Sequence, residues 1–338
     1  MKILMVNKFL YPNGGSETYI FKIGEQLEKT GHEVQYFGME HPERVVGNRV
    51  GSYTSSMDFH TGKLQKLMYP FKIIYSLEAR RKIRKVLDDF CPDIVHLNNF
   101  NYQLTPSILY EIRRFDKKNK KKTGILYTAH DYQWICPNHR MQIPETGELC
   151  SRCMDGKYGN CTKYKCIHNS KVKSLLGTVE AGLYRRLGTY RLVDAILCPS
   201  HFMEKMLEGN PALRGRTVMM HNFMDGAAQA GEGKTGDYVL YFGRYSEEKG
   251  IRTLAKVCRM LPDIPFVCAG SGPLEAELKA VPNICLKGFL KGRELQELIA
   301  DARFVVFPSE WYENCPFSVM EAQRYGTPVL ASRLGGTP

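Results

Sequence analysis

The chain has 338 residues, of which 43% are hydrophobic, 11% aromatic and 24% charged. This composition supplies enough apolar side chains for a large core and excludes a mainly disordered chain, and the length favours two domains over one. The net charge is +12. The whole excess lies in residues 1–200, with 31 Lys and Arg against 19 Asp and Glu, whereas residues 201–338 hold 16 of each.

No apolar run reaches the roughly 18 residues that a bilayer span requires. The short apolar stretch at the amino terminus is interrupted by Asn7 and Lys8. We therefore expect no signal peptide, no membrane span and a cytoplasmic protein. Eleven cysteines in such a chain favour reduced thiols over a disulfide framework. Four of them lie in apolar runs and are expected in the core: Cys198, Cys258, Cys268 and Cys285.

In the first half of the chain, short apolar runs alternate with amphipathic segments. Residues 2–10 form a β-prone run that ends at the turn-forming string 11–15, and Ser16 can cap the helix that follows. This strand, turn, helix, strand order is the building block of a doubly wound parallel sheet. Further strands are predicted at 33–37, 93–97, 124–128 and 195–199, and further helices at 73–90, 107–115 and 174–191.

A second alternating series begins at Tyr238, after a stretch of low hydrophobicity at 225–237 that resembles a linker. We predict strands at 238–243, 265–269, 284–287, 304–307 and 328–331, and helices at 250–260, 274–279, 293–300 and 316–325. The predicted fold is therefore α/β, with two Rossmann-like domains facing across a cleft. Their predicted bounds are 1–222, with a cysteine-rich insertion near 136–168, and 223–338.

Two loops of the first domain carry groups suited to a site. Gly14 and Gly15 follow the first strand and open a helix, where backbone N–H groups can approach a phosphate or a sugar oxygen. A plain tight turn explains the pair about as well. His130 and Asp131 end the strand at 124–128, where polar side chains of a site are expected. By itself such a histidine is more often structural.

The second domain carries charged residues after its strands. Arg244 and Lys249 lie in the loop after strand 238–243, where two cations could neutralise a diphosphate; the alternative is a pair of solvated basic side chains. Glu313 and Glu321 are eight residues apart, and Pro316 between them can start a helix. Carboxylates accept hydrogen bonds from vicinal sugar hydroxyls, so this spacing offers one acid to each of two rings.

These motifs together resemble a known family. The motifs are Gly14-Gly15, GHEV after the first helix, the His130-Asp131 pair, FGRYSEEKG, the AGSGP string at 269–273, and PSEWYENCPFSVMEAQRYGTPVLAS. The chain resembles, over nearly its whole length, the retaining glycosyltransferases of family 4, which have the two-Rossmann GT-B architecture. The Glu-x7-Glu block in the last string is the most specific of these elements.

The resemblance implies a role for each matching residue. Arg244 and Lys249 would bind the donor diphosphate, Glu313 the hydroxyls of the donor sugar, and Glu321 the nucleotide ribose. His130 would contact the donor sugar near the reacting carbon, and Gly15 would lie over the diphosphate. The resemblance thus implies His130, Arg244, Lys249 and Glu313 as catalytic residues. It implies a wider donor-binding set of Gly14, Gly15, Gly270, Gly272, Asn314, Cys315, Pro316, Phe317, Ser318 and Glu321.

The implied reaction is transfer of a sugar from a nucleoside diphosphate sugar, with retention of anomeric configuration, to a glycan or lipid-linked acceptor in cell-surface polysaccharide synthesis. No metal or other cofactor is implied for catalysis, and no nucleic-acid partner is expected. The chain stops at Pro338, where family members usually continue, so we expect a truncated second domain. The alternative is therefore a truncated, non-catalytic protein that binds sugar nucleotides.

Two features lie outside this resemblance. Cys150, Cys153, Cys161 and Cys166 could bind a structural zinc ion, or they could be reduced thiols on a loop. Basic residues also cluster near amphipathic helices, at 80–85, 113–122 and 171–191. They favour peripheral attachment to the anionic inner face of the cell membrane, with ordinary solubility charge as the alternative.

Overall fold

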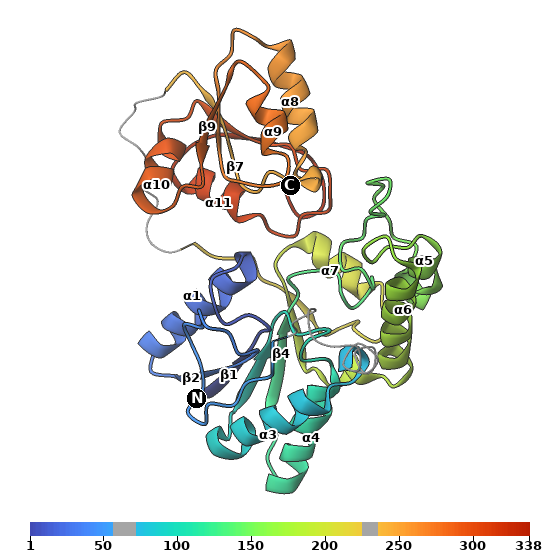
Figure 1. Cartoon of the computed structure of the whole chain (residues 1–338). Helices are drawn as coiled ribbons and strands as arrows, with labels where there is room; N and C mark the ends of the chain where they lie inside the picture. Colours follow the sequence, from blue (N-terminus) through green and yellow to red (C-terminus); the bar gives the residue numbers. More distant parts are fainter. Residues whose placement is uncertain (57–71, 225–235) are drawn as a thin grey trace. The chain divides into compact units, whose positions relative to one another are not determined.

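The protein, a computed structural model, is described over residues 1–56, 72–224 and 236–338. It divides into two compact units, Met1–Met220 and His221–Pro338 (Figure 1). Each unit has its own parallel sheet with helices, which confirms the predicted α/β class with two Rossmann-like domains. Most of the predicted linker at 225–237 lies outside the described residues.

Unit 1 is built on a six-stranded sheet in the order β2-β1-β3-β4-β5-β6, and every neighbouring pair is parallel. Leu4, Met5 and Val6 are fully buried, as expected for a strand covered on both faces. The strands are β1 Lys2–Val6, β2 Glu33–Phe37, β3 Ile94–Leu97, β4 Gly124–Thr128, β5 Ala195–Cys198 and β6 Thr217–Met219.

Three of the helices of unit 1 begin at serine caps. The hydroxyls of Ser76, Ser170 and Ser200 each accept a hydrogen bond from a backbone N–H in the first turn of the helix that follows. The helices are α1 Gly15–Lys29, α3 Leu77–Phe90, α4 Ser107–Asn119, α5 Gly159–Lys163, α6 Lys171–Arg186 and α7 His201–Glu208.

These caps correct two predicted boundaries. The helix predicted at 73–90 is broken at 75–76, because Ser76 caps a new helix that begins at Leu77. The helix predicted at 174–191 begins earlier, after the cap at Ser170, and ends at Arg186, because Gly188 turns left-handed with φ 63°. Helix α7 and the three-residue strand β6 were not predicted from the sequence.

Unit 2 has a five-stranded parallel sheet in the order β11-β10-β7-β8-β9. The strands are β7 Val239–Phe242, β8 Phe266–Ala269, β9 Ile284–Gly288, β10 Phe304–Phe307 and β11 Val329–Ala331. The helices are α8 Ile251–Met260, α9 Glu275–Lys279, α10 Gly292–Ala300 and α11 Phe317–Arg324. All five strands predicted for this part of the chain are confirmed.

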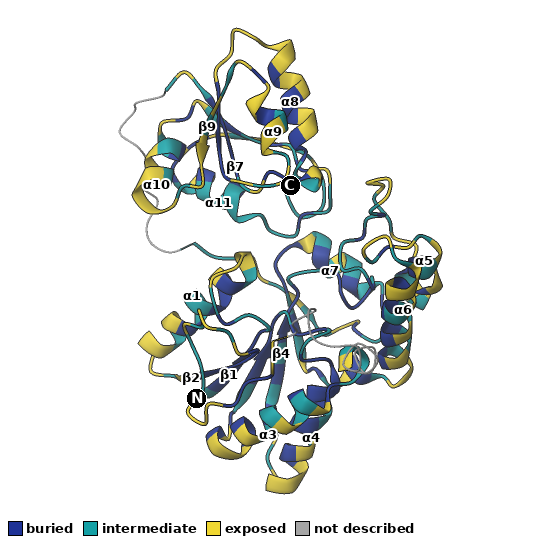
Figure 2. Cartoon of the chain, in the orientation of Figure 1, coloured by how far each residue is buried: buried dark blue, intermediate teal, exposed yellow. Residues whose placement is uncertain are grey.

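Hydrophobic clusters cover both faces of the unit 2 sheet. Strand β7 contributes Val239 and Tyr241 to one cluster and Leu240 and Phe242 to the other, because successive side chains point to opposite faces. Figure 2 shows the resulting dark blue strand in the interior of the unit. Cys198, Cys258 and Cys268 are buried as predicted, whereas Cys285 on the edge strand β9 is exposed.

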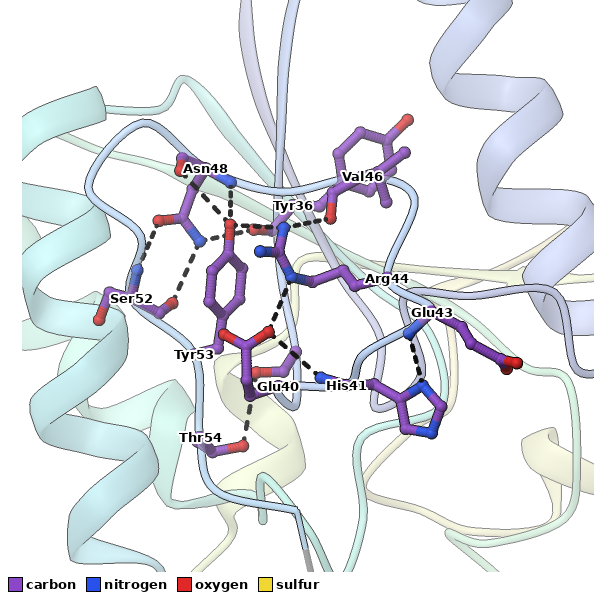
Figure 3. Close-up of polar contacts among 11 residues, drawn as sticks. Tyr36, Glu40, His41, Glu43, Arg44, Val46, Asn48, Ser52, Tyr53 and Thr54 are labelled. Carbon is purple, nitrogen blue, oxygen red and sulfur yellow. Dashed lines mark hydrogen bonds and ion pairs between the residues drawn. The ribbon is translucent and has the colours of Figure 1, made fainter.

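The segment after β2 is organised around one tyrosine (Figure 3). The buried Tyr53 hydroxyl accepts hydrogen bonds from the Asn48 backbone N–H at 2.8 Å and from Arg44 Nη1 at 3.1 Å. The Arg44 guanidinium also lies 4.0 Å from the centre of the Tyr53 ring, and its Nε bonds Glu40 Oε1 at 3.2 Å. These contacts order a segment that contains neither a helix nor a named strand.

One of the buried carboxyl groups of unit 1, that of Glu180, has no cation beside it among the groups that shift its pKa. Glu180 on α6 is 3% exposed, and its Oε1 atom has no hydrogen-bond partner among the described residues. It lies near the phenol groups of Tyr102, Tyr184 and Tyr190, whose pKa values its charge would raise. Burial raises the pKa of Glu180 to about 8, so the folded protein keeps this carboxyl protonated at neutral pH.

We predict that Glu180→Gln removes a pH-dependent loss of stability. Between the ordinary glutamate pKa of 4.5 and about 8, the unfolded chain releases a proton that the folded chain keeps. The free energy of unfolding of the wild type should therefore fall as pH rises, by about 1.4 kcal/mol per pH unit from this group. In urea unfolding at pH 5, 6.5 and 8, the free energy of unfolding of the variant should increase relative to that of the wild type at each step.

Glu25→Gln, the same change at an exposed position of α1, serves as the control. A stability difference between Glu180→Gln and the wild type that stays constant at all three pH values would show that the folded protein does not keep this carboxyl protonated.

Candidate functional site

Three loops of unit 2 meet where β7, β8 and β10 end. The loop after β7 bonds the loop after β8, because the Tyr245 N–H donates to Ser271 O at 2.8 Å. It also bonds the loop after β10, because the Glu310 N–H donates to Glu248 O at 2.9 Å. Ligands of open parallel sheets gather at this carboxyl edge. The predicted residues Arg244, Lys249, Gly270, Gly272 and Glu313 all lie in these loops.

Glycines allow the loops to approach this closely. At Gly250, φ is 71°, and a Cβ atom would lie 1.9 Å from the Pro308 carbonyl oxygen. At Gly270, φ is 148°, and a Cβ atom would lie 1.9 Å from the Gly243 carbonyl oxygen. Any larger residue would push the loops apart. Loop packing therefore requires glycine at Gly270, and a role for this residue and Gly272 in donor binding stays a prediction.

A partly buried ion pair occupies the centre of this edge. Lys249 Nζ lies 2.5 Å from Glu313 Oε1, and the side chains are 24% and 7% exposed. The Ser309 hydroxyl donates to the same carboxylate oxygen at 2.7 Å. The Lys249 ammonium also lies 5.7 Å from the Phe307 ring centre and 5.4 Å from that of Trp311, where cation–π attraction adds to the ion pair.

This arrangement refines the prediction from the sequence, in which Lys249 and Glu313 bind different parts of a ligand. The two side chains contact each other across 64 positions of sequence. Ser309 was not anticipated, although a hydroxyl residue shortly after an apolar strand is a usable signal. Arg244 is exposed on the same loop as Lys249, and its backbone carbonyl accepts a hydrogen bond from the Tyr241 hydroxyl at 2.8 Å.

The Glu-x7-Glu block runs from the β10 loop into α11. Pro316 is the residue before the helix, which begins at Phe317, so Glu321 lies inside α11 as predicted. Asn314, Cys315, Pro316, Phe317 and Ser318 form the entry to this helix. The Cys315 carbonyl accepts a hydrogen bond from Asn222 Nδ2 at 3.1 Å, and the Glu313 carbonyl accepts one from the Gly336 N–H at 2.7 Å. The backbone around Glu313 is therefore held in place.

Unit 1 has a second group of polar residues, at the carboxyl ends of β1, β3 and β4. Gly14 precedes α1 and Gly15 is its first residue. Glu17 in the first turn is buried, and its Oε1 accepts a hydrogen bond at 2.8 Å from Nδ2 of Asn7, which follows β1. Asn99, after β3, donates to the Ser16 hydroxyl at 2.9 Å. These contacts fix the start of α1 against the sheet.

The hydrogen bond between His130 and Asn98 decides which nitrogen of the imidazole carries the proton. Asn98 is fully buried, and its Nδ2 donates to the carbonyls of His96 at 3.3 Å and Val6 at 3.5 Å. Only the amide nitrogen can face two carbonyls, so Oδ1 faces His130 Nε2, 2.9 Å away. Because Oδ1 only accepts, Nε2 carries the proton and Nδ1 keeps its lone pair.

The surroundings of His130 keep it neutral. Burial lowers the pKa of His130 to about 4, an effect that the neighbouring Asp131 only partly offsets. Asp131 instead pairs with His139, whose Nδ1 lies 3.3 Å from the carboxylate. The ring of Tyr19 on α1 meets the His130 ring edge to face at 5.0 Å between centres. At neutral pH, His130 is therefore a hydrogen-bonding group and not a cation.

A second histidine lies beneath His130. His96 Nε2 is 2.7 Å from the Thr128 hydroxyl, which is also 3.2 Å from the Tyr19 hydroxyl. Burial lowers the pKa of His96 to about 3, so this ring is neutral as well. Asn98, His96 and Tyr19 were not predicted as site residues. His96 lies in β3, Tyr19 inside α1 and Asn98 directly after β3. These positions resemble ordinary core positions, and only the fold brings them to His130.

The cysteine-rich segment packs beside α6. Cys153, Cys161 and Cys166 are buried, and they line one small cavity together with Cys136 and Cys150. Burial raises the pKa of Cys136 to about 11 and that of Cys153 to about 12, so both are thiols at neutral pH. Within residues 1–56, 72–224 and 236–338, no group of three or more His, Cys, Asp or Glu is arranged to hold a metal ion. The zinc site stays a prediction.

Among the described residues, no helix has the length and apolar character needed to cross a bilayer.

Comparisons with known proteins agree with this architecture. Residues 13–227 match Glycosyltransferase Family 4, and residues 236–338 match Glycosyl transferases group 1. A Klebsiella pneumoniae protein described as an uncharacterized 42.6 kDa protein in the cps region is 24% identical over 355 residues. That alignment covers 99% of this chain and 86% of the relative.

Solved structures share the fold. The lipopolysaccharide outer core galactosyltransferase WaaB in its apo form is 16% identical with a TM-score of 0.59, and the match covers 100% of this chain and 82% of that one. Anabaena HepE in complex with UDP-glucose is 15% identical with a TM-score of 0.58, over 99% of this chain and 81% of that one. These neighbours have the GT-B fold. Because the Family 4 model matches more than half of its residues, the chain belongs to Glycosyltransferase Family 4, and its carboxy-terminal part matches Glycosyl transferases group 1.

Proposed function

We propose that the protein is a retaining hexosyltransferase that moves a sugar from a nucleoside diphosphate sugar to a glycan or lipid-linked acceptor in cell-surface polysaccharide synthesis. The observation that carries the proposal is the Lys249–Glu313 pair at the carboxyl edge of the unit 2 sheet. The UDP-glucose bound to the structural neighbour HepE supports a donor of this class. The basic excess of residues 1–200 supports peripheral attachment to an anionic membrane surface.

In this proposal, unit 2 binds the nucleotide part of the donor. Lys249 and Arg244 bind the diphosphate, and Glu313 accepts hydrogen bonds from sugar hydroxyls. Glu321 accepts hydrogen bonds from the ribose hydroxyls. Gly270, Gly272 and the backbone from Asn314 to Ser318 approach the sugar and phosphates. Without donor, Glu313 neutralises the Lys249 ammonium. An arriving diphosphate supplies negative charge of its own, which lets Lys249 turn to the phosphates.

The proposed reaction breaks the bond between the anomeric carbon and the phosphate oxygen and forms a bond to the acceptor oxygen on the same face. The leaving phosphate oxygen takes the acceptor proton, so no protein nucleophile is required. Negative charge grows on the diphosphate as the bond breaks, and fixed cations stabilise it more in the transition state than in the ground state. We propose that Lys249 and Arg244 fill this role without a metal ion.

The proposal gives His130 of unit 1 a hydrogen-bond-accepting role. Because Asn98 Oδ1 accepts the Nε2 proton, Nδ1 is the atom left to accept a hydrogen bond from a hydroxyl of the donor sugar. Its neutrality also avoids an added positive charge beside the oxocarbenium-like carbon of the transition state. Gly14 and Gly15 would place backbone N–H groups of α1 near the diphosphate.

We predict that Lys249→Ala abolishes donor recognition. A panel of UDP-, GDP- and ADP-sugars should give one donor that raises the melting temperature of the wild type and releases its nucleotide. The variant should lose the thermal shift and release nucleotide about 100-fold more slowly or worse, because one charge-stabilising group is removed. Lys256→Ala, at an exposed position of α8, is the control.

Lys249→Ala also leaves Glu313 buried without its cation, which should destabilise unit 2. The double variant Lys249→Met/Glu313→Gln removes both charges, so it should regain stability yet still fail to bind the donor. A double variant that restores the donor-induced shift would overturn the proposed pocket.

The tautomer of His130 can be measured directly. In ¹⁵N-histidine-labelled protein, the signals that disappear in His130→Gln should show protonation at Nε2 alone, unchanged from pH 8 to about 5.5 because burial lowers the pKa of His130 to about 4. Asn98→Asp places a carboxylate beside Nε2, so the pKa of His130 should rise. Asn98→Leu should give a mixture of tautomers. Protonation at Nδ1 in the wild type would refute the assignment.

We also propose a structural zinc ion bound by Cys150, Cys153, Cys161 and Cys166, supported by the one cavity that they line. Their side chains would have to rotate to converge on an ion, which would stabilise them as thiolates. Elemental analysis of protein purified without chelator should find about one zinc per chain, lost in Cys150→Ser/Cys153→Ser and kept in the exposed-site control Cys91→Ser. Wild-type protein without zinc would reject the site.

A further inference from the structure

Helix α6 exposes aliphatic side chains along one face. Val172, Leu175, Val179 and Leu183 are 69%, 50%, 47% and 36% exposed, and they recur every three or four residues. This spacing places them in one stripe along the helix. Leu187, the residue after the helix, extends the stripe and is 57% exposed. Single exposed aliphatic residues are ordinary, but a continuous stripe of five is typical of an interaction surface.

The opposite face of α6 is the one that packs into unit 1. Its buried residues are Ser174, Gly177, Glu180, Ala181 and Tyr184, and most of them are small or polar. Ser174 accepts a hydrogen bond from the Ile167 N–H at 2.9 Å, and Thr178 contacts Thr162 of α5 through their hydroxyls at 2.8 Å. The helix is therefore held mainly by small and hydrogen-bonding side chains, and four of its five large aliphatic side chains are exposed, Leu176 being partly buried.

The charges on α6 are almost all positive. Lys171, Lys173 and Arg186 are exposed, and Arg185 is partly exposed. The one acid of the helix, Glu180, lies on the buried face. From 157 to 191 the sequence holds eight Lys and Arg and only this one Glu. In Figure 1, α5 and α6 lie side by side at the periphery of unit 1.

We infer that the exposed face of α6 is the surface by which the protein attaches to an anionic lipid bilayer. Aliphatic side chains of a surface helix insert at the boundary between head groups and acyl chains, while flanking Lys and Arg reach the anionic head groups. A second copy of the chain is less favoured as the partner of this face, because pairing two such faces would bring like positive charges together.

This inference rests on the membrane attachment proposed above and names its surface. Membrane binding requires no catalysis, so this inference can be wrong while the proposed glycosyl transfer is correct.

Vesicle co-sedimentation of the full chain tests the inference. The probes are vesicles of phosphatidylcholine alone and of phosphatidylcholine with about 30% phosphatidylglycerol, at low and physiological salt. We expect the wild type to bind the anionic vesicles more tightly, and less so as salt rises. Leu175→Ser/Leu183→Ser and Lys171→Glu/Arg186→Glu should each weaken this binding about tenfold or more, because each removes inserted apolar area or head-group contacts.

Two controls make the same changes on α8 of unit 2. Val257→Ser/Met260→Ser alters exposed apolar residues, and Lys256→Glu/Arg259→Glu alters exposed basic residues outside residues 1–200; both should bind within about twofold of the wild type. Unchanged circular dichroism and melting temperature would show that the α6 variants fold.

The outcomes separate the claims. If the wild type binds but the α6 variants bind equally well, α6 is not the surface, although attachment stands. If the wild type binds no vesicles, or is a dimer that Leu175→Ser/Leu183→Ser makes monomeric, the inference is overturned.

Discussion

Parallel strand pairing is the constraint on which the chemistry of this protein depends. A parallel sheet brings the carboxyl ends of its strands to one edge, so loops from distant parts of the sequence become neighbours. Lys249 and Glu313 meet in this way across 64 residues, and Asn98 and His130 across 32. Neither pair belongs to one local motif. Each unit thus assembles its polar group at its own sheet edge, with helices and apolar clusters behind it.

Much of this fold could be predicted, because buried parallel strands appear in sequence as short apolar runs between turn residues. The five strands of unit 2 are confirmed in order, from Val239 to Ala331. Helix ends were less predictable. The apolar pattern continues past Ser76, and only the hydroxyl cap there stops one helix and starts α3. Strand β6 has three residues, too few for a pattern, and gains its definition from pairing with β5.

The residue types of the candidate site and the loops that carry them could be predicted, but not which side chains contact each other. The positions of Arg244, Lys249 and Glu313 after strands point to a charged edge. That Lys249 and Glu313 neutralise each other depends on the approach of the β7 and β10 loops, which no spacing encodes. Asn98 is harder still. It is one of three asparagines in residues 97–101, and the one that faces His130 is decided by where β3 ends and by which carbonyls lie within reach of its amide.

The close approach of the glycine loops has a consequence for altering donor preference by mutation. Gly250 and Gly270 hold the three strand-end loops against one another through backbone contacts, so the main chain there acts as a single rigid frame. Insertions or loop exchanges in this frame would disturb all three loops at once. Exposed side chains on these loops can change without moving it. Diversification of sugar-nucleotide choice in such a scaffold should therefore proceed by side-chain exchange on an unaltered main chain.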